Sequence, residues 1–319
     1  MRIMIHFPFD EDQIEAFRTL AAQYGDHEVV HVANEEEALP LAAETDILLG
    51  HFPAAICAVA SQLRWIQSFS AGMDNFLFPE IVARHDVVVT NMAGLYAPQG
   101  GEHAWALLLA LARGLHTSVA AMTAGKWGRG APVVELTGAT LGIVGLGGFG
   151  LETLKRAQGY DMQVLALDPV RTQAPTGVDE LKKPSRDNLH ALLGRADAVV
   201  IACPRTPQTY HLIGAAELAA MKESAYLVNV TRGGIIDETA LLEALQQGQI
   251  AGAGLDVTET EPLPADDPLW QAPNLILTPH RAGASQHRPR KTFEFFHDNL
   301  GRYLRGEEVL NVVDKQRGF

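Results

Sequence analysis

Three side chains that can hold charge or move a proton follow apolar runs in the second half of the chain. Arg232 stands in Asn-Val-Thr-Arg-Gly-Gly, Glu261 precedes Pro-Leu-Pro, and His280 follows Leu-Thr-Pro. A planar guanidinium grips a carboxylate through two parallel hydrogen bonds and polarises an adjacent carbonyl, which Lys cannot reproduce. An imidazolium can protonate a carbonyl oxygen, and a carboxylate on its other nitrogen fixes the tautomer and favours the charged form. The set predicts proton transfer at the carbonyl of a 2-oxo acid.

Each of the three residues also has an ordinary structural explanation. An Arg before Gly-Gly is common in surface turns, and an acid before Pro is common in solvated loops. A His at a strand end can be a buried core residue, and the chain has 12 His. What favours catalysis is that all three follow predicted parallel strands, since open α/β sheets bind ligands beyond the carboxyl ends of their strands.

A glycine-rich turn lies between a predicted strand over 141–144 and a predicted helix over 151–158. Its sequence fits G-x-G-x-x-G, with the glycines at Gly145, Gly147 and Gly150. The pattern allows a tight turn, close approach of the backbone to a pyrophosphate, and close packing of helix on strand. The helix N-terminus then offers free N–H groups to the phosphates. These features predict a dinucleotide site.

Asp168 ends the next predicted strand, over 162–167. Its carboxylate can accept hydrogen bonds from free ribose hydroxyls and would repel a 2′-phosphate. NAD(H) is therefore the expected cofactor, and NADP(H) is less favoured. Arg171 keeps the second possibility open, because it can pair with a phosphate if Asp168 swings aside.

Short apolar runs alternate with helical patterns along the whole chain, which predicts an α/β protein with two doubly wound parallel-sheet domains. The first series has expected strands at 3–7, 28–32, 47–49, 65–68 and 87–90, with helices at 11–24, 35–43 and 54–61. The second has strands at 141–144, 162–167, 198–203, 225–230, 252–257 and 275–278, with helices at 102–116, 151–158, 187–195, 215–222 and 239–247. A Gly- and Pro-containing hinge is expected at 92–98, and a last helix at 290–305 is expected to return to the first domain.

Composition limits the classes of partner. The 319 residues suffice for two domains, and 25 basic against 38 acidic side chains give a formal net charge of −13. This charge argues against nucleic acid and requires a local positive pocket for an anionic substrate. No apolar run is long enough for a bilayer, and the N-terminal one is too short for a signal peptide. Cys57 and Cys203 are expected to be buried thiols in a reducing cytoplasm, and no metal site is expected.

On these motifs the chain resembles the D-isomer-specific 2-hydroxyacid dehydrogenases, and glyoxylate or hydroxypyruvate reductases in particular, over nearly its whole length. The resemblance implies a Rossmann dinucleotide-binding domain at 96–287, inserted into a smaller flavodoxin-like substrate domain at 1–95 and 288–319. It implies that Arg232, Glu261 and His280 are catalytic. The expected reaction interconverts a small 2-oxo acid (glyoxylate, hydroxypyruvate, pyruvate or similar) and the D-2-hydroxy acid with NAD(H).

The resemblance also implies binding residues around that catalytic set. The substrate carboxylate is expected at the backbone N–H groups of Ala71 and Gly72, and Tyr96 either lies near the substrate or packs as a hinge aromatic. His51 is better explained as a solvated loop histidine. Besides the three glycines and Asp168, the implied cofactor contacts are Gly148, Phe149, Cys203, Pro204, Thr209, Val230, Thr231, Arg232, Asp256 and His280, with Asp256 beside the nicotinamide.

Two positions depart from the family pattern. Gly148-Phe149 stands where the family usually has a basic residue, which removes a positive charge near the pyrophosphate. Arg281 replaces a usually apolar neighbour of His280 and either adds a second cation to the pocket or points to solvent. Because dehydrogenase-like transcriptional corepressors can keep the same triad, an NAD(H)-sensing interaction protein is the alternative function.

A homodimer is the expected assembly. The segment 104–112 is rich in Ala and Leu and is hydrophobic nearly all round, more so than a surface helix requires. We expect this helix to pack across a two-fold axis, as in the family. The alternative is a helix buried within one subunit.

Overall fold

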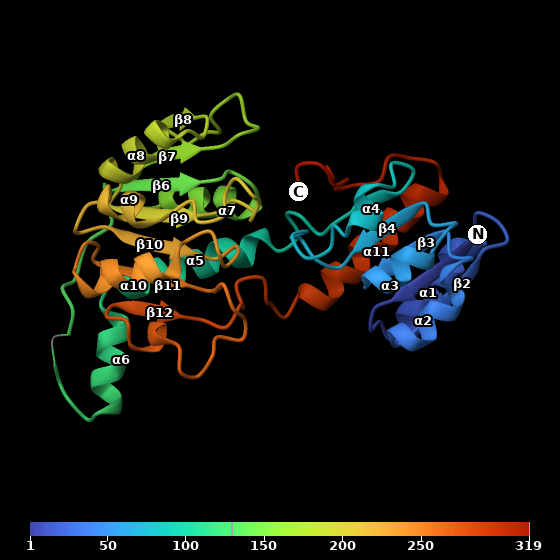
Figure 1. Cartoon of the computed structure of the whole chain (residues 1–319), viewed down its shortest axis with the longest axis horizontal. Coiled ribbons are helices and arrows are strands. Elements are labelled where there is room, and N and C mark those ends of the chain that lie inside the picture. The colour runs from blue at the N-terminus through green and yellow to red at the C-terminus, as the bar shows by residue number, and fades with distance from the viewer. Residues whose placement is uncertain (129, 319) are drawn as a thin grey trace. The chain divides into compact units, whose positions relative to one another are not determined.

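The computed structural model describes residues 1–128 and 130–318, and the chain divides into two compact units (Figure 1). Unit 1 consists of Met1–Tyr96 and Ser285–Phe319, and unit 2 of Ala97–Ala284. The division lies one residue after the expected boundary at 95/96 and three residues before that at 287/288. Each unit contains its own parallel sheet, so the expected fold class of two doubly wound parallel-sheet domains is confirmed.

Unit 1 is built on a five-stranded sheet in the order β2-β1-β3-β4-β5, in which all paired strands are parallel. This is the flavodoxin-like order, with its switch point between β1 and β3. The central strands β3 and β4 are buried at every position, which is typical of parallel strands covered on both faces. The strands are β1 (Arg2–His6), β2 (Glu28–His31), β3 (Ile47–Gly50), β4 (Trp65–Ser68) and β5 (Val88–Thr90).

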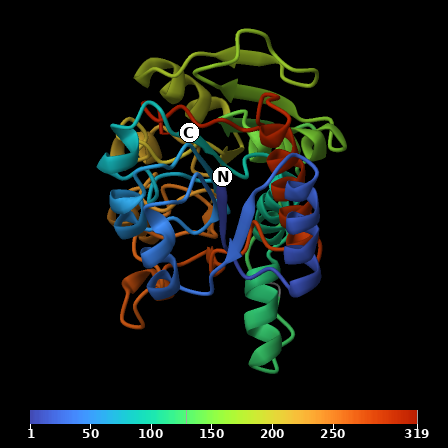
Figure 2. The ribbon, with the colours of Figure 1, turned by 90° about the vertical axis from the view of Figure 1, so that its right-hand side faces the viewer.

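Helices cover both faces of this sheet. Figure 2 shows α1 (Glu11–Ala22) beside α11 (Arg288–Leu304), and the two helices are in contact. Asp10 begins α1 with a capping box, since its side chain accepts from the Gln13 N–H and the Gln13 side chain accepts from the Asp10 N–H. The other helices are α2 (Glu35–Ala42), α3 (Ala54–Val59) and the single turn α4 (Pro79–Val82), which the sequence analysis missed.

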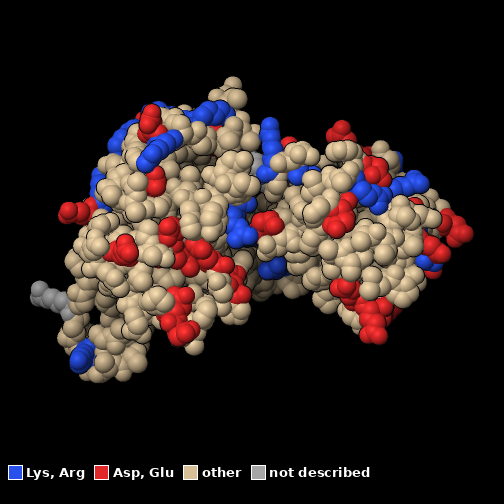
Figure 3. All heavy atoms as spheres, in the orientation of Figure 1, with Lys and Arg blue, Asp and Glu red and all other residues tan. Residues whose placement is uncertain are grey.

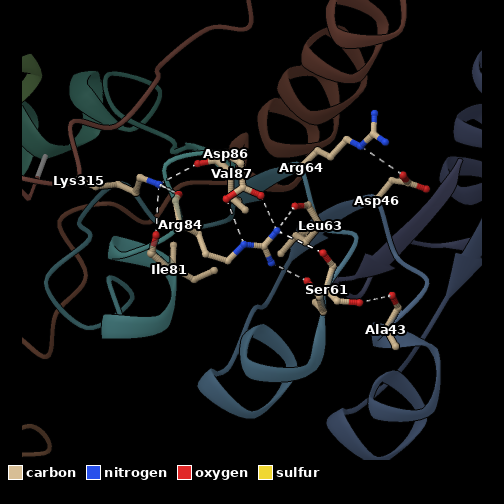
Figure 4. A network of polar contacts seen from close by, with 11 residues as sticks. Ala43, Asp46, Ser61, Leu63, Arg64, Ile81, Arg84, Asp86, Val87 and Lys315 are labelled. Atoms are coloured by element: carbon tan, nitrogen blue, oxygen red, sulfur yellow. Dashed lines mark hydrogen bonds and ion pairs between the residues drawn. The ribbon is translucent and has the colours of Figure 1, made fainter.

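Two cations attach the C-terminal segment and the β4–β5 connection to the sheet of unit 1 (Figure 4). The Lys315 Nζ donates to the carbonyls of Ile81, Arg84 and Val87, and burial lowers the pKa of Lys315. The Arg84 guanidinium donates to the Leu63 carbonyl at 2.8 Å and to the Asp86 carboxylate at 2.7 Å. These bonds satisfy loop carbonyls that no strand partner reaches.

Unit 2 is built on a seven-stranded parallel sheet in the order β12-β11-β10-β9-β6-β7-β8. Counted from β6, this is the 3-2-1-4-5-6 order of a dinucleotide-binding fold with one more strand at the β12 edge. The strands are β6 (Thr140–Val144), β7 (Gln163–Leu167), β8 (Glu180–Lys182), β9 (Ala198–Ile201), β10 (Tyr226–Asn229), β11 (Gly252–Leu255) and β12 (Leu275–Leu277). The edge strand β8 was not predicted, because three residues of Glu-Leu-Lys carry no periodic signal.

The helices of unit 2 pack against its sheet and complete the hydrophobic core. The helix α5 (Ala97–Ala112) contacts α7 (Gly148–Gln158) and strands β10 and β11. The others are α8 (Arg186–Arg195), α9 (Ala215–Ala219), α10 (Glu238–Gln246) and the 3₁₀ turn η1 (Pro268–Gln271). Between them lie two clusters of buried apolar residues, one on each face of the sheet.

One expectation about the helices is wrong. The segment 102–116 is not one helix, because α5 ends at Ala112, Gly114 takes a left-handed φ of 61°, and α6 (Leu115–Thr123) follows in a new direction. Positions Ala104, Leu108 and Ala112 of α5 are fully buried within this single chain, so that face of the helix is not available to a second copy. The physical reason is that the sheet of unit 2 needs this apolar helix to cover one of its faces.

Among the described residues, no single helix is long and apolar enough to cross a membrane. Only α5 and α6 taken together meet that criterion, as a pair bent by 70°.

Candidate active site

The three expected catalytic residues follow neighbouring strands of unit 2 at one edge of the sheet. Strands β10, β11 and β12 are paired so that Asn229 lies opposite Leu255, and Leu255 opposite Leu277. The chain after these strand ends carries Arg232, Glu261 and His280 respectively. Parallel strands place their carboxyl ends at the same edge, which is where such sheets bind ligands.

His280 and Glu261 form a hydrogen-bonded pair. The Nδ1 atom of His280 lies 2.6 Å from Oε2 of Glu261, and the other Glu261 oxygen accepts from the Thr258 N–H at 3.1 Å. With Nδ1 facing a carboxylate, this nitrogen carries the proton, and the tautomer is set. Both side chains are partly exposed, so Nε2 of His280 can reach a molecule outside the protein. The geometry is that of a histidine held ready to donate or accept a proton at Nε2.

The loop that carries His280 is anchored by Asp256, which is 1% exposed at the end of β11. Its carboxylate accepts from Thr278 Oγ1 at 2.6 Å and from the N–H groups of Arg281 and Ala282 at 2.9 and 2.7 Å, and His103 Nε2 lies 3.1 Å away. Burial alone would raise the pKa of Asp256, but the hydrogen bonds from His103, Thr278 and the two backbone groups outweigh burial and lower it. With four protein donors, Asp256 positions the His280 loop.

Arg232 is half-buried in the turn after β10. The side-chain amide of Asn229 donates to the Arg232 carbonyl at 2.8 Å and accepts from the Thr231 N–H at 3.1 Å, which holds the turn. A Cβ on Gly233 would lie 1.8 Å from the Thr258 carbonyl oxygen. Only glycine permits this approach, which places the Arg232 turn directly against the loop that carries Glu261.

The glycine-rich turn fits a dinucleotide pyrophosphate. The helix α7 begins at Gly148 with Gly147 as its N-cap, and an added Cβ on Gly147 would meet no atom within 4 Å. On Gly150 the added Cβ would lie 2.1 Å from the Gly145 carbonyl oxygen. Gly147 thus leaves open space in front of the helix N-terminus, and Gly150 lets the helix pack against the turn.

Phe149, in the first turn of α7, packs against a neighbouring helix of unit 2. A Cβ on Gly100 of α5 would lie 2.4 Å from the Phe149 ring, so this ring packs between α7 and α5. The Phe149 side chain therefore contributes packing between these two helices.

Asp168 is held in place at the end of β7. Its Oδ2 accepts from the Leu146 N–H at 2.9 Å, and its Oδ1 accepts from the N–H groups of Val170 and Arg171 at 2.8 and 2.7 Å. The side chain cannot swing aside without losing all three bonds. The Nε of Arg171 donates to the Leu146 carbonyl at 2.9 Å, so this cation is tied to the glycine-rich turn.

The other expected cofactor residues lie at the same sheet edge. Cys203 is buried after β9, and an added Cβ on Gly145 would lie 2.8 Å from its backbone nitrogen. Burial raises the pKa of Cys203 to about 12, so the thiol stays neutral. Thr209 closes the following turn, since its hydroxyl donates to the Pro204 carbonyl at 2.7 Å. Val230 is buried directly after β10.

In unit 1, the loop after β4 presents two outward N–H groups. The Ser70 carbonyl accepts from the Met92 N–H at 3.0 Å, and the Ala71 carbonyl accepts from the Asn91 side chain at 2.9 Å. Because each peptide is planar and trans, the N–H groups of Ala71 and Gly72 point the opposite way. Among the described residues, neither N–H donates to a backbone carbonyl. This pair could bind a carboxylate, in line with the sequence expectation.

Tyr96 and His51 differ in their surroundings. Tyr96 is buried in unit 1, where its hydroxyl lies 3.1 Å from Thr292 Oγ1 and the Arg288 guanidinium lies 4.5 Å from its ring centre. This environment favours the packing explanation of Tyr96. His51 is exposed but contacts aromatic rings, so it is more than a solvated loop histidine.

The sequence analysis missed three positioning residues, namely His103, Thr278 and Asn91. His103 gave one signal, since it is a polar residue inside the apolar α5. Nothing in the sequence marks Asn91, because its bond to the Ala71 carbonyl joins residues 20 positions apart.

Acidic residues surround the Glu261 loop, and Figure 3 shows acidic side chains on this face of unit 2. Glu238, at the start of α10, accepts from the Glu259 N–H at 2.6 Å. Burial, and then the charges of Glu259, Asp267 and Glu261, raise the pKa of Glu238 to about 7. The folded protein therefore binds this proton more tightly than the unfolded chain does, and the resulting stability is present below about pH 4.5 and is lost as pH rises through 7.

Glu238→Gln is accordingly expected to stabilise the protein at pH 8 by roughly 1 kcal/mol and to change it little at pH 5, because Gln keeps the acceptor without the charge. Thermal or denaturant unfolding at the two pH values measures this effect. The control is Glu243→Gln, on the exposed side of the same helix. Equal stability of wild type and Glu238→Gln at pH 8 would contradict the assignment.

Comparison with known proteins identifies relatives over the whole chain. The family model "D-isomer specific 2-hydroxyacid dehydrogenase, NAD binding domain" matches residues 105–282. A glyoxylate reductase of Korarchaeum cryptofilum is 36% identical over 282 residues, which cover 86% of this chain and 83% of that protein.

Solved structures agree with this match. A D-isomer specific 2-hydroxyacid dehydrogenase family protein of Aeromonas salmonicida superposes with a TM-score of 0.81 at 32% identity, over 98% of this chain and 99% of that one. Another such dehydrogenase, from Xanthobacter autotrophicus in complex with NADPH, superposes with a TM-score of 0.81 at 28% identity. The match covers 100% of this chain and 99% of that one. Arg232, Glu261 and His280 follow neighbouring strands, and the glycine-rich turn precedes α7. Together with this arrangement, the matches show that the chain belongs to the D-isomer specific 2-hydroxyacid dehydrogenase family.

Proposed function

We propose that this enzyme reduces a small 2-oxo acid to the D-2-hydroxy acid with NADH, or catalyses the reverse reaction. The observation that carries the proposal is the 2.6 Å bond from His280 Nδ1 to Glu261, with Arg232 on the neighbouring turn. Glyoxylate, hydroxypyruvate, pyruvate and similar 2-oxo acids are the candidate substrates.

Each residue has a distinct role in this proposal. In unit 2, Arg232 binds the substrate carboxylate and polarises the adjacent carbonyl. In unit 1, the N–H groups of Ala71 and Gly72 form a separate candidate anion site for a carboxylate. When bound, the nicotinamide supplies the hydride for reduction. His280 donates the Nε2 proton to the carbonyl oxygen, and Glu261 stabilises the imidazolium before the transfer. In oxidation, neutral His280 removes the hydroxyl proton.

Loss of NADH absorbance with glyoxylate, hydroxypyruvate, pyruvate and phenylpyruvate tests the proposal. We expect turnover of at least one 2-oxo acid, and D- rather than L-hydroxy acids as substrates of the reverse reaction. NADH binding without turnover of any of the four would overturn the proposal and favour a dinucleotide-sensing protein.

Cofactor choice gives a second test. We expect kcat/KM for NADH to exceed that for NADPH by about tenfold or more, because Asp168 is held by three N–H groups where the ribose hydroxyls would bind. Steady-state kinetics with both cofactors at saturating substrate provide the comparison. A preference for NADPH would show that Arg171, not Asp168, decides the choice.

A homodimer remains part of the proposal, and α6 offers a further surface for it besides the segment 104–112. The helix α6 buries none of its residues and stands away from the rest of unit 2 in both views (Figures 1 and 2). Leu115, Val119 and Met122 lie on one face of it at i, i+4 and i+7, all exposed, and Trp127 beyond it is fully exposed. An apolar face of this kind is typical of an interface, and we propose that a second copy covers it.

Light scattering at micromolar concentration is expected to give twice the mass of the 34.5 kDa chain. Val119→Asp should shift the protein towards the monomer, because it places a charge in the apolar face. A wild-type monomer would refute the dimer.

A further inference from the structure

Three ring-bearing residues stand side by side at the carboxyl edge of the unit 1 sheet. The strand register places Gly50 opposite both His6 and Ser68. The residues that follow these three positions are therefore neighbours at the carboxyl ends of adjacent strands. Those residues are Phe7 after β1, His51 after β3 and Phe69 after β4. The ring centres lie 4.1 Å apart for His51 and Phe69, and 5.9 Å apart for Phe7 with either of them. We call these three residues the ring wall.

The ring wall is open on one side. Its rings are partly or largely exposed, whereas Phe296, whose ring centre lies 5.7 Å from that of Phe7, is fully buried. Phe76 packs edge-on against Phe69 at 5.5 Å and supports it from the side. The Phe rings have no hydrogen-bonding atoms, so the wall suits an apolar group.

The imidazole in the wall is also largely uncharged at neutral pH. Burial, and then the nearby His6, lower the pKa of His51. His6 Nδ1 lies 3.0 Å from the His51 carbonyl, which fixes the backbone at this position. A neutral imidazole stacked among phenyl rings presents a π surface to a ligand.

The ring wall adjoins the expected carboxylate site within the same unit. Phe69 is followed by Ser70, and the outward N–H groups belong to the next two residues, Ala71 and Gly72. Two residues of chain span at most about 7 Å, which is also the reach from a carboxylate carbon to the far side of a benzyl group. A 2-oxo acid whose carboxylate binds these N–H groups can therefore lay its side chain on the rings.

We propose that the ring wall is the specificity surface of the enzyme and that it receives the aromatic or bulky apolar side chain of a 2-oxo acid. The preferred substrates are then of the arylpyruvate class, and glyoxylate, which has no side chain, gains nothing from the wall. This inference rests on the proposed function, since it names the substrate class of that reaction.

The test compares kcat/KM for phenylpyruvate, 4-methyl-2-oxopentanoate and glyoxylate in wild type, Phe69→Ala and Phe69→Leu. We expect wild type to favour phenylpyruvate over glyoxylate by tenfold or more, since even one methylene in an apolar pocket changes selectivity by about 10–200-fold. Phe69→Ala should lower the phenylpyruvate value at least tenfold more than it lowers the glyoxylate value. Phe69→Leu should keep the alkyl substrate while losing part of the aryl preference.

The matched control is Phe78→Ala, which removes a partly buried ring of the same unit that is not part of the wall. It should leave the phenylpyruvate-to-glyoxylate ratio unchanged, and circular dichroism shows whether each variant is folded. If Phe69→Ala is unfolded, the Leu variant carries the test. Turnover of glyoxylate in preference to phenylpyruvate, with a ratio that Phe69→Leu does not alter, overturns the inference and leaves the proposed function standing. No turnover of any 2-oxo acid overturns the proposed function itself.

Discussion

His280→Ala is expected to lower kcat/KM for 2-oxo acid reduction by about 10²–10⁴-fold, because the variant lacks the group that donates the proton. NADH binding should survive, since the glycine-rich turn and Asp168 lie after other strands of the sheet. Steady-state kinetics and a fluorescence titration of NADH measure the two properties separately. Loss of NADH affinity equal to the loss of rate would mean that His280 acts on the fold or on cofactor binding.

Glu261→Gln is the companion variant and should lose less rate than His280→Ala. Gln keeps a hydrogen-bonding group beside Nδ1 but removes the negative charge 2.6 Å from it, so the positive charge that forms on the imidazole loses its partner. We expect kcat/KM for reduction to fall while the dissociation constant of NADH stays as in wild type, and steady-state kinetics with an NADH titration measure both. Reduction by Glu261→Gln at the wild-type rate would mean that Glu261 does not assist His280.

Gly147→Ala and Gly150→Ala are expected to weaken NADH binding for different reasons. In Gly150→Ala the new methyl group would lie 2.1 Å from a backbone oxygen, so the turn must move and the melting temperature should fall. In Gly147→Ala no protein atom lies within 4 Å of the methyl group and φ is −74°, so stability should be unchanged. The methyl group would nevertheless occupy the space in front of the helix N-terminus, and we expect the dissociation constant of NADH to rise tenfold or more.

Gly128→Ala provides the surface control for this pair, because its added methyl group also meets no atom within 4 Å. It should leave both NADH affinity and melting temperature as in wild type. If Gly147→Ala binds NADH as tightly as Gly128→Ala does, the pyrophosphate does not bind at this turn.

The sequence by itself determined the strand–turn–helix of the glycine-rich turn, the acid after the second strand, and the order in which Arg232, Glu261 and His280 follow neighbouring strands. These features are local: glycine spacing, apolar runs and the residues that end them follow from backbone sterics and burial over ten to thirty residues. For the same reason most strands of both sheets were predicted within one or two residues, and the edge strand β8, with three residues and no periodic pattern, was not.

Only the tertiary structure decided which side chains hold other side chains in position and which apolar side chains stay exposed to solvent. Asp256, which is expected beside the nicotinamide, is buried among four donors from distant parts of the chain, and these bonds anchor the His280 loop. One face of α5 packs in the core of unit 2, while Ala106 on α5 and the apolar side chains of α6 stay exposed. The ring wall brings together three residues up to 62 positions apart, and no periodic pattern in the sequence links them. Their neighbourhood depends on the parallel register of β1, β3 and β4, which exists only in the folded sheet.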